Sequence, residues 1–476
     1  MSHTPETATS NDYKLPATGG WADAWKIAAG VGIAGVAGCI AAASIDPSRA
    51  AFSYLFAFEA VLSLALGMLF FVLIQHLTSS GWSVTVRRTA EFFASALPVM
   101  FILFLPILFR MNELFPWVHA GEHGGGHGEH ASITLVREAR ADVPAHPGAT
   151  EEGHVAKPAE PHHAGKGEHV ENVEHAAAAH GAGHLPDPHH VEHESILKKK
   201  APYLNKGFFI GRAVFYFIVW SLLGIQFFKN STKQDQTKDA KHTLDSQRMA
   251  PVATFLFGIT LTFAAVDWIM SLEPSWFSTI FGVYIFATGV VSSLAMLILV
   301  TMSLNEAGIL KNKVNVEHYH DIGKLLFGFN VFWAYIGFSQ FMLIWYAALP
   351  EETTWYHRRW DNGPWAGVSM FLLTGHFIVP SFLLISRNVK RRLPLLKLGA
   401  LIMVLMHVVD LYWFVMPNHA ANLPDPNSFS FSWMDLVSLF AVAGVYFAAV
   451  FFTMKKHSLI PVGDPRLPRA LSFENA

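Results

Sequence analysis

The stretch FSYLFAFEAVLSLALGMLFFVLIQH, residues 52–76, decides the fold. Its only acidic or basic side chain, histidine aside, is that of Glu59. An α-helix needs about 20 apolar residues to cross the hydrocarbon of a bilayer. A strand of a membrane barrel would instead alternate apolar and polar residues over about ten positions. This stretch does not alternate, so it predicts a transmembrane helix.

Nine further apolar runs of similar length accompany it. Over the whole chain 52% of residues are hydrophobic and only 15% are charged, which excludes an ordinary soluble protein of this length. We therefore expect an all-α membrane protein of about ten transmembrane helices. The predicted spans are 24–44, 52–76, 90–110, 207–228, 249–271, 276–303, 323–349, 364–386, 394–416 and 432–454.

The distribution of Lys and Arg predicts the orientation. The loops on the side of the two termini hold most of them, whereas the opposite short loops hold only Arg49, Arg358 and Arg359. Positive loops stay in the cytoplasm, so both termini are expected there, in a bacterial inner membrane. The formal net charge of −2 gives no support for a nucleic-acid partner. The predicted organisation is a cytoplasmic segment 1–23, helices 1–3 in 24–110, a periplasmic insert 111–206, helices 4–10 in 207–454, and a cytoplasmic tail 455–476.

The insert 111–206 is rich in histidine and holds 15 of the 25 histidines of the chain. It lacks apolar periodicity, so it cannot bury enough surface to fold alone, and we expect it to be disordered. Buffering of a metal ion by the clustered imidazoles is a second interpretation. A segment that docks a partner in response to pH is a third.

Two pairs of segments resemble internal copies. Residues 217–221 (FIVWS) match 377–381 (FIVPS), and 265–267 (AVD) match 408–410 (VVD). The copies follow the same order and cross the membrane in the same direction. We therefore expect two four-helix bundles, spans 2–5 and spans 6–9, with spans 1 and 10 peripheral.

Ionisable side chains inside the predicted spans are candidates for function, since a charge at the centre of a bilayer is costly. The candidates for proton transfer are Glu59, Asp267, His376, His407 and Asp410. His407 and Asp410 are three residues apart and share a helix face. A structural hydrogen bond is the alternative for each of these residues.

Arg212 is a candidate for an ion pair with a carboxylate on a neighbouring span. Haem b held by two histidines is a competing interpretation of His376 and His407. The chain lacks the paired histidines on each of two helices that haem b generally requires. No catalytic residue and no metal site are predicted.

Several motifs, taken together, resemble a known family. They are residues 267–279 (DWIMSLEPSWFST), 323–329 (GKLLFGF), 338–346 (FSQFMLIWY), 375–380 (GHFIVP) and 407–410 (HVVD). This set is similar to the F-type membrane subunit of alternative complex III, also called quinone-binding subunit 2, of the polysulfide-reductase/NrfD-like family. The resemblance covers roughly residues 20–455 apart from the histidine-rich insert, which departs from the family.

The resemblance implies a fold of two four-helix bundles and a non-catalytic place in a quinol:cytochrome c oxidoreductase. The implied partners are the paralogous C-type membrane protein, the B-type iron–sulfur protein, multihaem and monohaem cytochromes c, and other small membrane subunits. Haem c and iron–sulfur clusters would belong to those partners, and no redox cofactor is expected in this chain. The C-type protein is credited with oxidising quinol, and the F-type protein with proton-conducting half-channels.

The loop 351–365 is the candidate docking surface for outer partners, through Trp355, Arg358, Arg359 and Trp360. Two other functions stay open at this point. One is a redox subunit that binds quinone directly near His376. The other is a secondary transporter, a class in which parallel repeats and charges within the membrane also occur.

Overall fold

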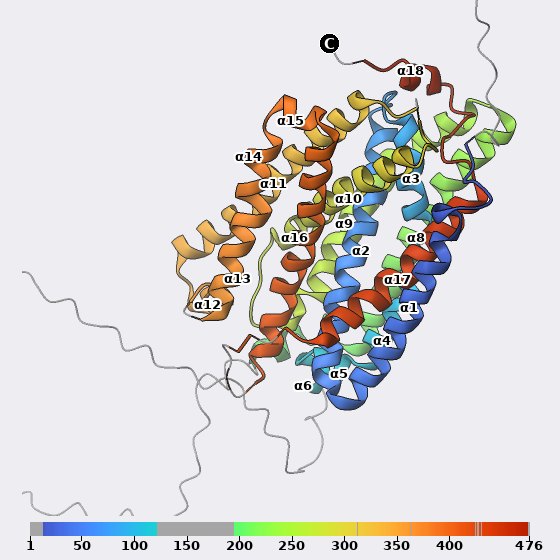
Figure 1. Cartoon of the computed structure of the whole chain (residues 1–476). Coiled ribbons are helices and arrows are strands. Elements are labelled where there is room, and N and C mark those ends of the chain that lie inside the picture. Colours follow the sequence, from blue (N-terminus) through green and yellow to red (C-terminus); the bar gives the residue numbers. More distant parts are fainter. Residues whose placement is uncertain are drawn as a thin grey trace, which may run out of the picture.

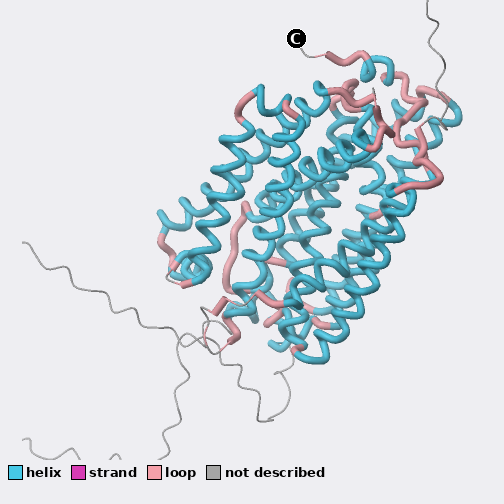
Figure 2. The backbone as a smooth tube through the Cα atoms, in the orientation of Figure 1, coloured by secondary structure: helices cyan, strands magenta, loops and turns pink. Residues whose placement is uncertain are grey.

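The structure, a computed structural model, describes residues 13–120 and 195–474, apart from 312, 362, 424, 426, 427 and 430. Every regular element in these residues is helical (Figure 2). Ten helical segments are long and apolar enough to cross a membrane, which confirms the predicted fold class. They are Gly20–Ile45, Pro47–Leu77, Val84–Phe109, Lys206–Thr237, Lys241–Leu272, Phe281–Glu306, Val316–Ala347, Pro364–Leu384, Leu393–Ala420 and Trp433–Lys456.

Some of these segments are built from more than one helix (Figure 1). The long single helices are α1 (Gly20–Ile45), α2 (Pro47–Leu77), α8 (Lys206–Thr237), α9 (Lys241–Trp268), α10 (Phe281–Glu306), α11 (Val316–Ala347), α16 (Leu393–Ala420) and α17 (Trp433–Lys456). The third span divides into α3 (Val84–Ser95) and α4 (Leu97–Phe109), and the eighth into α13 (Pro364–Leu372), a π-helical turn (Leu373–Ile378) and α14 (Val379–Leu384). Short helices in the connections are α5 (Met111–Leu114), α6 (Trp117–Ala120), a 3₁₀ turn (Met270–Leu272), α12 (Pro350–Trp360), α15 (Arg387–Arg391) and α18 (Leu467–Leu471).

The spans form two rings of four, as the internal repeat predicts. In the first bundle α2, the α3–α4 span, α8 and α9 each contact their neighbours around the ring. In the second bundle α10, α11, the α13–α14 span and α16 do the same. Helices α1 and α17 pack against each other and against α2, outside both rings (Figure 1).

The two bundles meet where α2 lies against α10. A Cβ atom added to Gly67 would come within 2.2 Å of the carbonyl oxygen of Gly289, and one added to Gly289 would come within 2.5 Å of the carbonyl of Ser63. Only glycine therefore lets the two backbones approach this closely. As a result, the side chains of α2 on this face reach directly into the second bundle.

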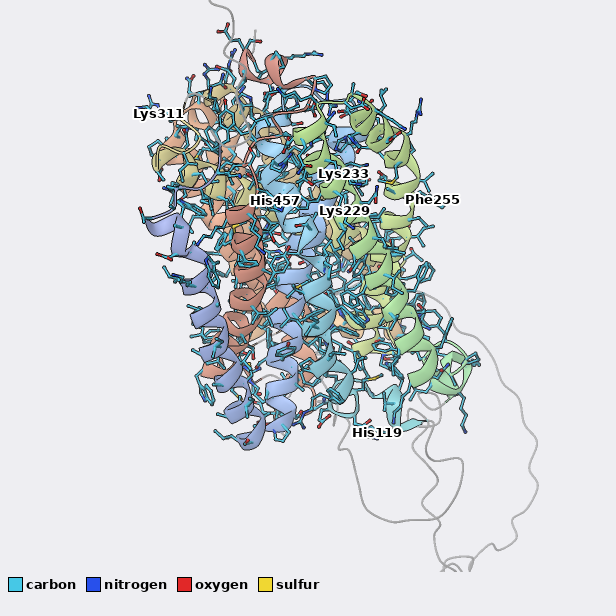
Figure 3. The ribbon with its side chains drawn as sticks, turned by 90° about the vertical axis from the view of Figure 1, so that its right-hand side faces the viewer. His119, Lys229, Lys233, Phe255, Lys311 and His457 are labelled. Atoms are coloured by element: carbon cyan, nitrogen blue, oxygen red, sulfur yellow. The ribbon has the colours of Figure 1, made fainter. Side chains whose placement is uncertain are left out.

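The two ends of the molecule differ in composition. We call the end that carries residues 13–19 and 457–474 the tail face, because the backbone N–H of Leu459 donates to the carbonyl of Tyr13 there. The other end, with α5, α6 and α12, is the insert face, because the histidine-rich segment starts from it. Figure 3 shows Lys311 at the tail face and His119 at the insert face.

Several predicted boundaries are wrong because helices continue beyond the hydrocarbon. The predicted loop 229–248 is mostly helix, since α8 runs to Thr237 and α9 begins at Lys241. Arg87 and Arg88, expected in a loop, lie within α3 and are at most 1% exposed. The helix backbone satisfies its own hydrogen bonds, so nothing forces it to end at the bilayer boundary.

The predicted disorder of the insert falls mainly on residues 121–194, which lie outside the described residues, as does most of the predicted metal-buffering region. At the described start of the insert, Met111–Leu114 and Trp117–Ala120 are helical. Phe115 and Trp117 are buried against Phe209 of α8. Helical structure therefore continues for about ten residues past the predicted boundary at 110.

A buried ionic cluster ties the chain end to the bundle at the tail face. Arg87 contacts Glu91 and Asp464, each at 2.8 Å, and Arg466 contacts Asp464 at 2.9 Å. Arg88 contacts Glu91 at 3.0 Å and Asp235 at 2.8 Å. Burial alone would raise the pKa of Asp464, but the two arginines outweigh it and hold that pKa well below its usual range.

A polar cluster at the centre of the bundles

Asp410 is the best-placed acid in the second bundle. It is fully buried in α16, and its Oδ2 accepts hydrogen bonds from Thr288 of α10 at 2.7 Å and from Trp333 of α11 at 2.9 Å. The other carboxylate oxygen, Oδ1, has no partner in the described part of the chain. Three helices of the ring therefore converge on one carboxylate that keeps a free oxygen.

His376 lies next to this group, in the π-helical turn of the eighth span. Its ring stacks on Trp333 with the centroids 3.9 Å apart and the planes 20° apart. The wide turn has a cause in the sequence, because Pro380 has no N–H for the carbonyl of His376 and its ring would clash with that carbonyl in an α-helix. His376 is fully buried, and neither ring nitrogen has a partner among the described residues.

His407 reaches from α16 across to the first bundle. Its Nε2 lies 2.9 Å from the carbonyl oxygen of Ala60 and 3.3 Å from the hydroxyl of Ser63, both on α2. A carbonyl can only accept, so Nε2 carries the hydrogen and Nδ1 is left as an acceptor. Nδ1 has no partner in the described ranges.

Glu59 completes the group from α2. Its side chain is 4% exposed, and Oε1 has no hydrogen-bond partner within the described residues. The hydroxyl of Ser63, one turn further along α2, donates to the carbonyl of Glu59 at 2.6 Å. The backbone carbonyl of Glu59 and the imidazole of His407 therefore both contact the Ser63 hydroxyl, where the two bundles touch.

We call Glu59, His376, His407 and Asp410 the central cluster. Between them they hold five buried polar atoms without a protein partner in the part of the chain that the structure describes. Buried polar groups are costly unless they form hydrogen bonds, and water commonly supplies those bonds inside proteins. Carboxyl and imidazole groups both gain and lose protons readily, so this arrangement is chemically suited to proton exchange.

The fifth proton-transfer candidate, Asp267, lies elsewhere and is bonded differently. Arg212 of α8 forms two bonds to its carboxylate, at 2.8 Å and 2.9 Å, and Tyr216 donates to it at 2.9 Å. Arg212 also stacks on Tyr203, with the guanidinium carbon 3.8 Å from the ring centroid. Asp267 is thus engaged in an ion pair, in the position that Asp410 occupies in the second copy.

The four docking candidates divide by exposure. Trp355 is 3% exposed and Arg359 is fully buried, so neither side chain is available to an outside partner. Arg359 donates to the carbonyls of Trp413 and Phe414, at 3.2 Å and 3.1 Å. Pro417, four residues after Trp413, has no N–H to offer that carbonyl, and Arg359 takes its place. Burial lowers the pKa of Arg359 to about 9, which still leaves it charged at neutral pH.

The other two candidates remain at the surface of the insert face. Trp360 is 37% exposed. The side chain of Arg358 is 31% exposed and lies 3.2 Å from the carboxylate of Glu273.

Sequence reasoning missed three members of the site: Ser63, Thr288 and Trp333. Ser63 carries a usable signal, because it stands four residues after Glu59 and so lies on the same face of the helix. Thr288 and Trp333 carry none. They bond to Asp410 across 122 and 77 residues of sequence, and only the packing of the second bundle brings them together.

No protein-family model matches this chain, and no curated protein is significantly similar to it.

Proposed function

We propose that this chain is a non-catalytic membrane subunit of a quinol-oxidising respiratory complex of the alternative complex III type, in which it supports proton movement. The central cluster is the observation that carries this proposal. A purely architectural membrane anchor has little reason to hold two acids and two histidines within its membrane-spanning segments, with polar atoms that have no partner among the described residues.

The contrast between the two copies of the repeat supports the assignment of proton movement to the second bundle. The carboxylate of Asp267 is neutralised by Arg212, and both of its oxygens accept hydrogen bonds. Within the described structure, Asp410 accepts from neutral donors alone and has one oxygen without a partner. Binding a proton at Asp410 therefore breaks no ion pair, whereas protonating Asp267 would leave a buried arginine without its partner.

The cluster gives a proton a short sequence of acceptors. A proton on the Glu59 carboxyl can pass through a water molecule to Nδ1 of His407, because Nε2 already carries a hydrogen that bonds to Ala60. The imidazole can take a proton at one ring nitrogen and release one from the other. Asp410, three residues along the same helix face, is the next acceptor, and His376 lies on the far side of Trp333. The chain itself transfers no electrons in this scheme.

The rest of the assembly follows from the motifs quoted above. The paralogous C-type membrane protein would oxidise quinol, and the B-type iron–sulfur protein and the cytochromes c would carry the electrons. The complex would lie in the inner membrane of a bacterium, with both termini of this chain in the cytoplasm. A chain with this role should purify together with haem-containing partners, whereas a secondary transporter would purify alone.

The test is the number of protons translocated per electron by the intact complex in sealed vesicles. Asp410→Asn and His407→Gln keep the size of the side chain and remove the exchangeable proton site. We expect both variants to assemble and to oxidise quinol, with fewer protons moved per electron. Unchanged proton stoichiometry in both variants would refute the proposal.

Asp267→Asn is the matched control. It makes the same chemical change at the equivalent position of the other bundle, in a group that we assign to an ion pair. The complex that assembles with this variant should keep the native ratio of protons to electrons, although it should be less stable. Equal loss of proton movement in Asp267→Asn and Asp410→Asn would mean that the effect is one of general damage.

A direct quinone-binding redox subunit is the second candidate, and His376 is the observation that favours it. Both of its ring nitrogens lack partners in the described structure, and either could bond to a quinone carbonyl. A photoreactive quinone analogue should then label the second bundle near Trp333. His376→Leu should abolish that labelling together with quinol oxidation, whereas the proton-transfer proposal expects quinol oxidation to persist.

A further inference from the structure

A groove opens sideways between α1 and α4, near the insert face. Both helices pack on α2 and α17, which form the floor of the groove. Its walls include Val36 and Ile40 of α1 and Ile102 and Ile107 of α4, and its volume is about 290 Å³. Ile40 and Ile102 are 67% and 63% exposed, so the groove faces the membrane and not the core.

The uncharged polar side chains of this groove already have partners. The hydroxyl of Tyr54 donates to the carbonyl of Leu103 at 2.8 Å. The thiol of Cys39 lies 3.7 Å from the hydroxyl of Ser438. The remaining surface is almost entirely aliphatic, so hydrocarbon is the occupant that it suits.

The dimensions of the groove correspond to one leaflet of a bilayer. From Ile102 to Arg110 it follows α4 for about 12 Å at 1.5 Å per residue. One leaflet contributes about half of the roughly 30 Å of hydrocarbon. The groove therefore runs from near mid-membrane to the level at which lipid headgroups begin.

Arg110, the one charged residue of the lining, stands at that outer end. It follows the last residue of α4, and its side chain is 39% exposed. Nη1 binds Glu113 at 2.9 Å, and the other guanidinium N–H groups have no described partner. A guanidinium binds a phosphate through two parallel N–H groups, so Arg110 can bind a phosphodiester while keeping Glu113.

We propose that this groove binds a glycerophospholipid, with one acyl chain between α1 and α4 and its phosphate on Arg110. An aliphatic channel of one-leaflet depth with a cation at the headgroup end matches the chemistry of a phospholipid along its whole length. The site is separate from the central cluster, and this inference does not depend on the proposed function.

The experiment uses the purified full-length chain in phosphatidylcholine vesicles that contain phosphatidylglycerol with a photoreactive acyl chain. Cross-linked residues are located by mass spectrometry of peptides. We expect labelling to concentrate on the α1 and α4 residues that line the groove. Arg110→Gln should reduce it roughly fivefold, the effect of about one basic residue at a lipid surface. Ala43→Phe, which fills the groove from α1, should abolish it.

Two matched variants serve as controls. Ala41→Phe adds the same ring to the same helix at an exposed position, and Lys199→Gln removes an exposed charge at the insert face. Both should label like the native chain. Equal labelling of every exposed helix, unaffected by Arg110→Gln, would show only bulk lipid and overturn the proposal. Displacement of the label by a short-chain quinone would assign the groove to quinone instead. If Ala43→Phe fails to fold, Arg110→Gln still decides the question.

Discussion

Separating Arg212 from Asp267 should strongly destabilise the first bundle. Arg212 is bound to this carboxylate at 2.8 Å and 2.9 Å, and its side chain is only 10% exposed. Asp267→Asn keeps the shape of the acid but leaves the guanidinium beside a neutral amide. Arg212→Met does the reverse and leaves a buried carboxylate with only Tyr216 as a donor.

Removing one partner of a buried ion pair costs about 3–5 kcal/mol. We expect each single variant to lie in that range, with Arg212→Met the more costly because the acid is completely buried. The double variant leaves no unpaired charge. Its destabilisation should therefore be smaller than the sum of the two single effects by about 2–3 kcal/mol.

The assay is equilibrium unfolding by SDS in mixed micelles, followed by tryptophan fluorescence. Trp268, next to Asp267 and only 1% exposed, should report the opening of this region. The four chains of the cycle are measured under identical lipid and detergent conditions. Additive single effects, or singles costing less than about 1 kcal/mol as surface pairs do, would refute a buried and coupled pair.

Three further predictions concern other parts of the molecule. Gly67→Ala should destabilise the contact between the bundles by about 1–3 kcal/mol or prevent folding, because the new methyl group meets the Gly289 carbonyl. Thermal unfolding in detergent measures this loss of stability, and Gly258→Ala, which has open space around the new methyl group, is the control that should have no effect. Asp464→Asn should destabilise the chain most at pH 6 and less at pH 3: because the folded pKa is depressed, the stabilisation is complete above the unfolded value of about 3.9 and is lost gradually as the pH falls from there to the folded pKa, so a pH-independent loss in the SDS titration would contradict the assignment. Arg359→Lys should lower the free energy of unfolding by about 2–4 kcal/mol in the same titration, since one ammonium cannot replace a planar guanidinium that binds two carbonyls of α16 and stacks on the indole of Trp355. An unchanged free energy of unfolding would show that any cation suffices.

The amino-acid sequence alone determines the ten spans and their grouping into two bundles. Run length and the absence of alternation are local properties, and the hydrocarbon imposes the helix wherever such a run occurs. The neighbouring positions of His407 and Asp410 follow from helix geometry in the same way. The isolation of Glu59 among apolar residues of its helix is likewise a property of the local sequence.

The tertiary structure alone decides which partners each buried polar side chain has. Asp267 and Asp410 stand at matching places in the repeat, yet one is paired with Arg212 and the other accepts from Thr288 and Trp333. Arg359, which the sequence places in an exposed loop, is instead enclosed by α16. These outcomes depend on partners 54 to 122 residues away, and the distance between such partners is set by how the helices pack, which no local pattern encodes.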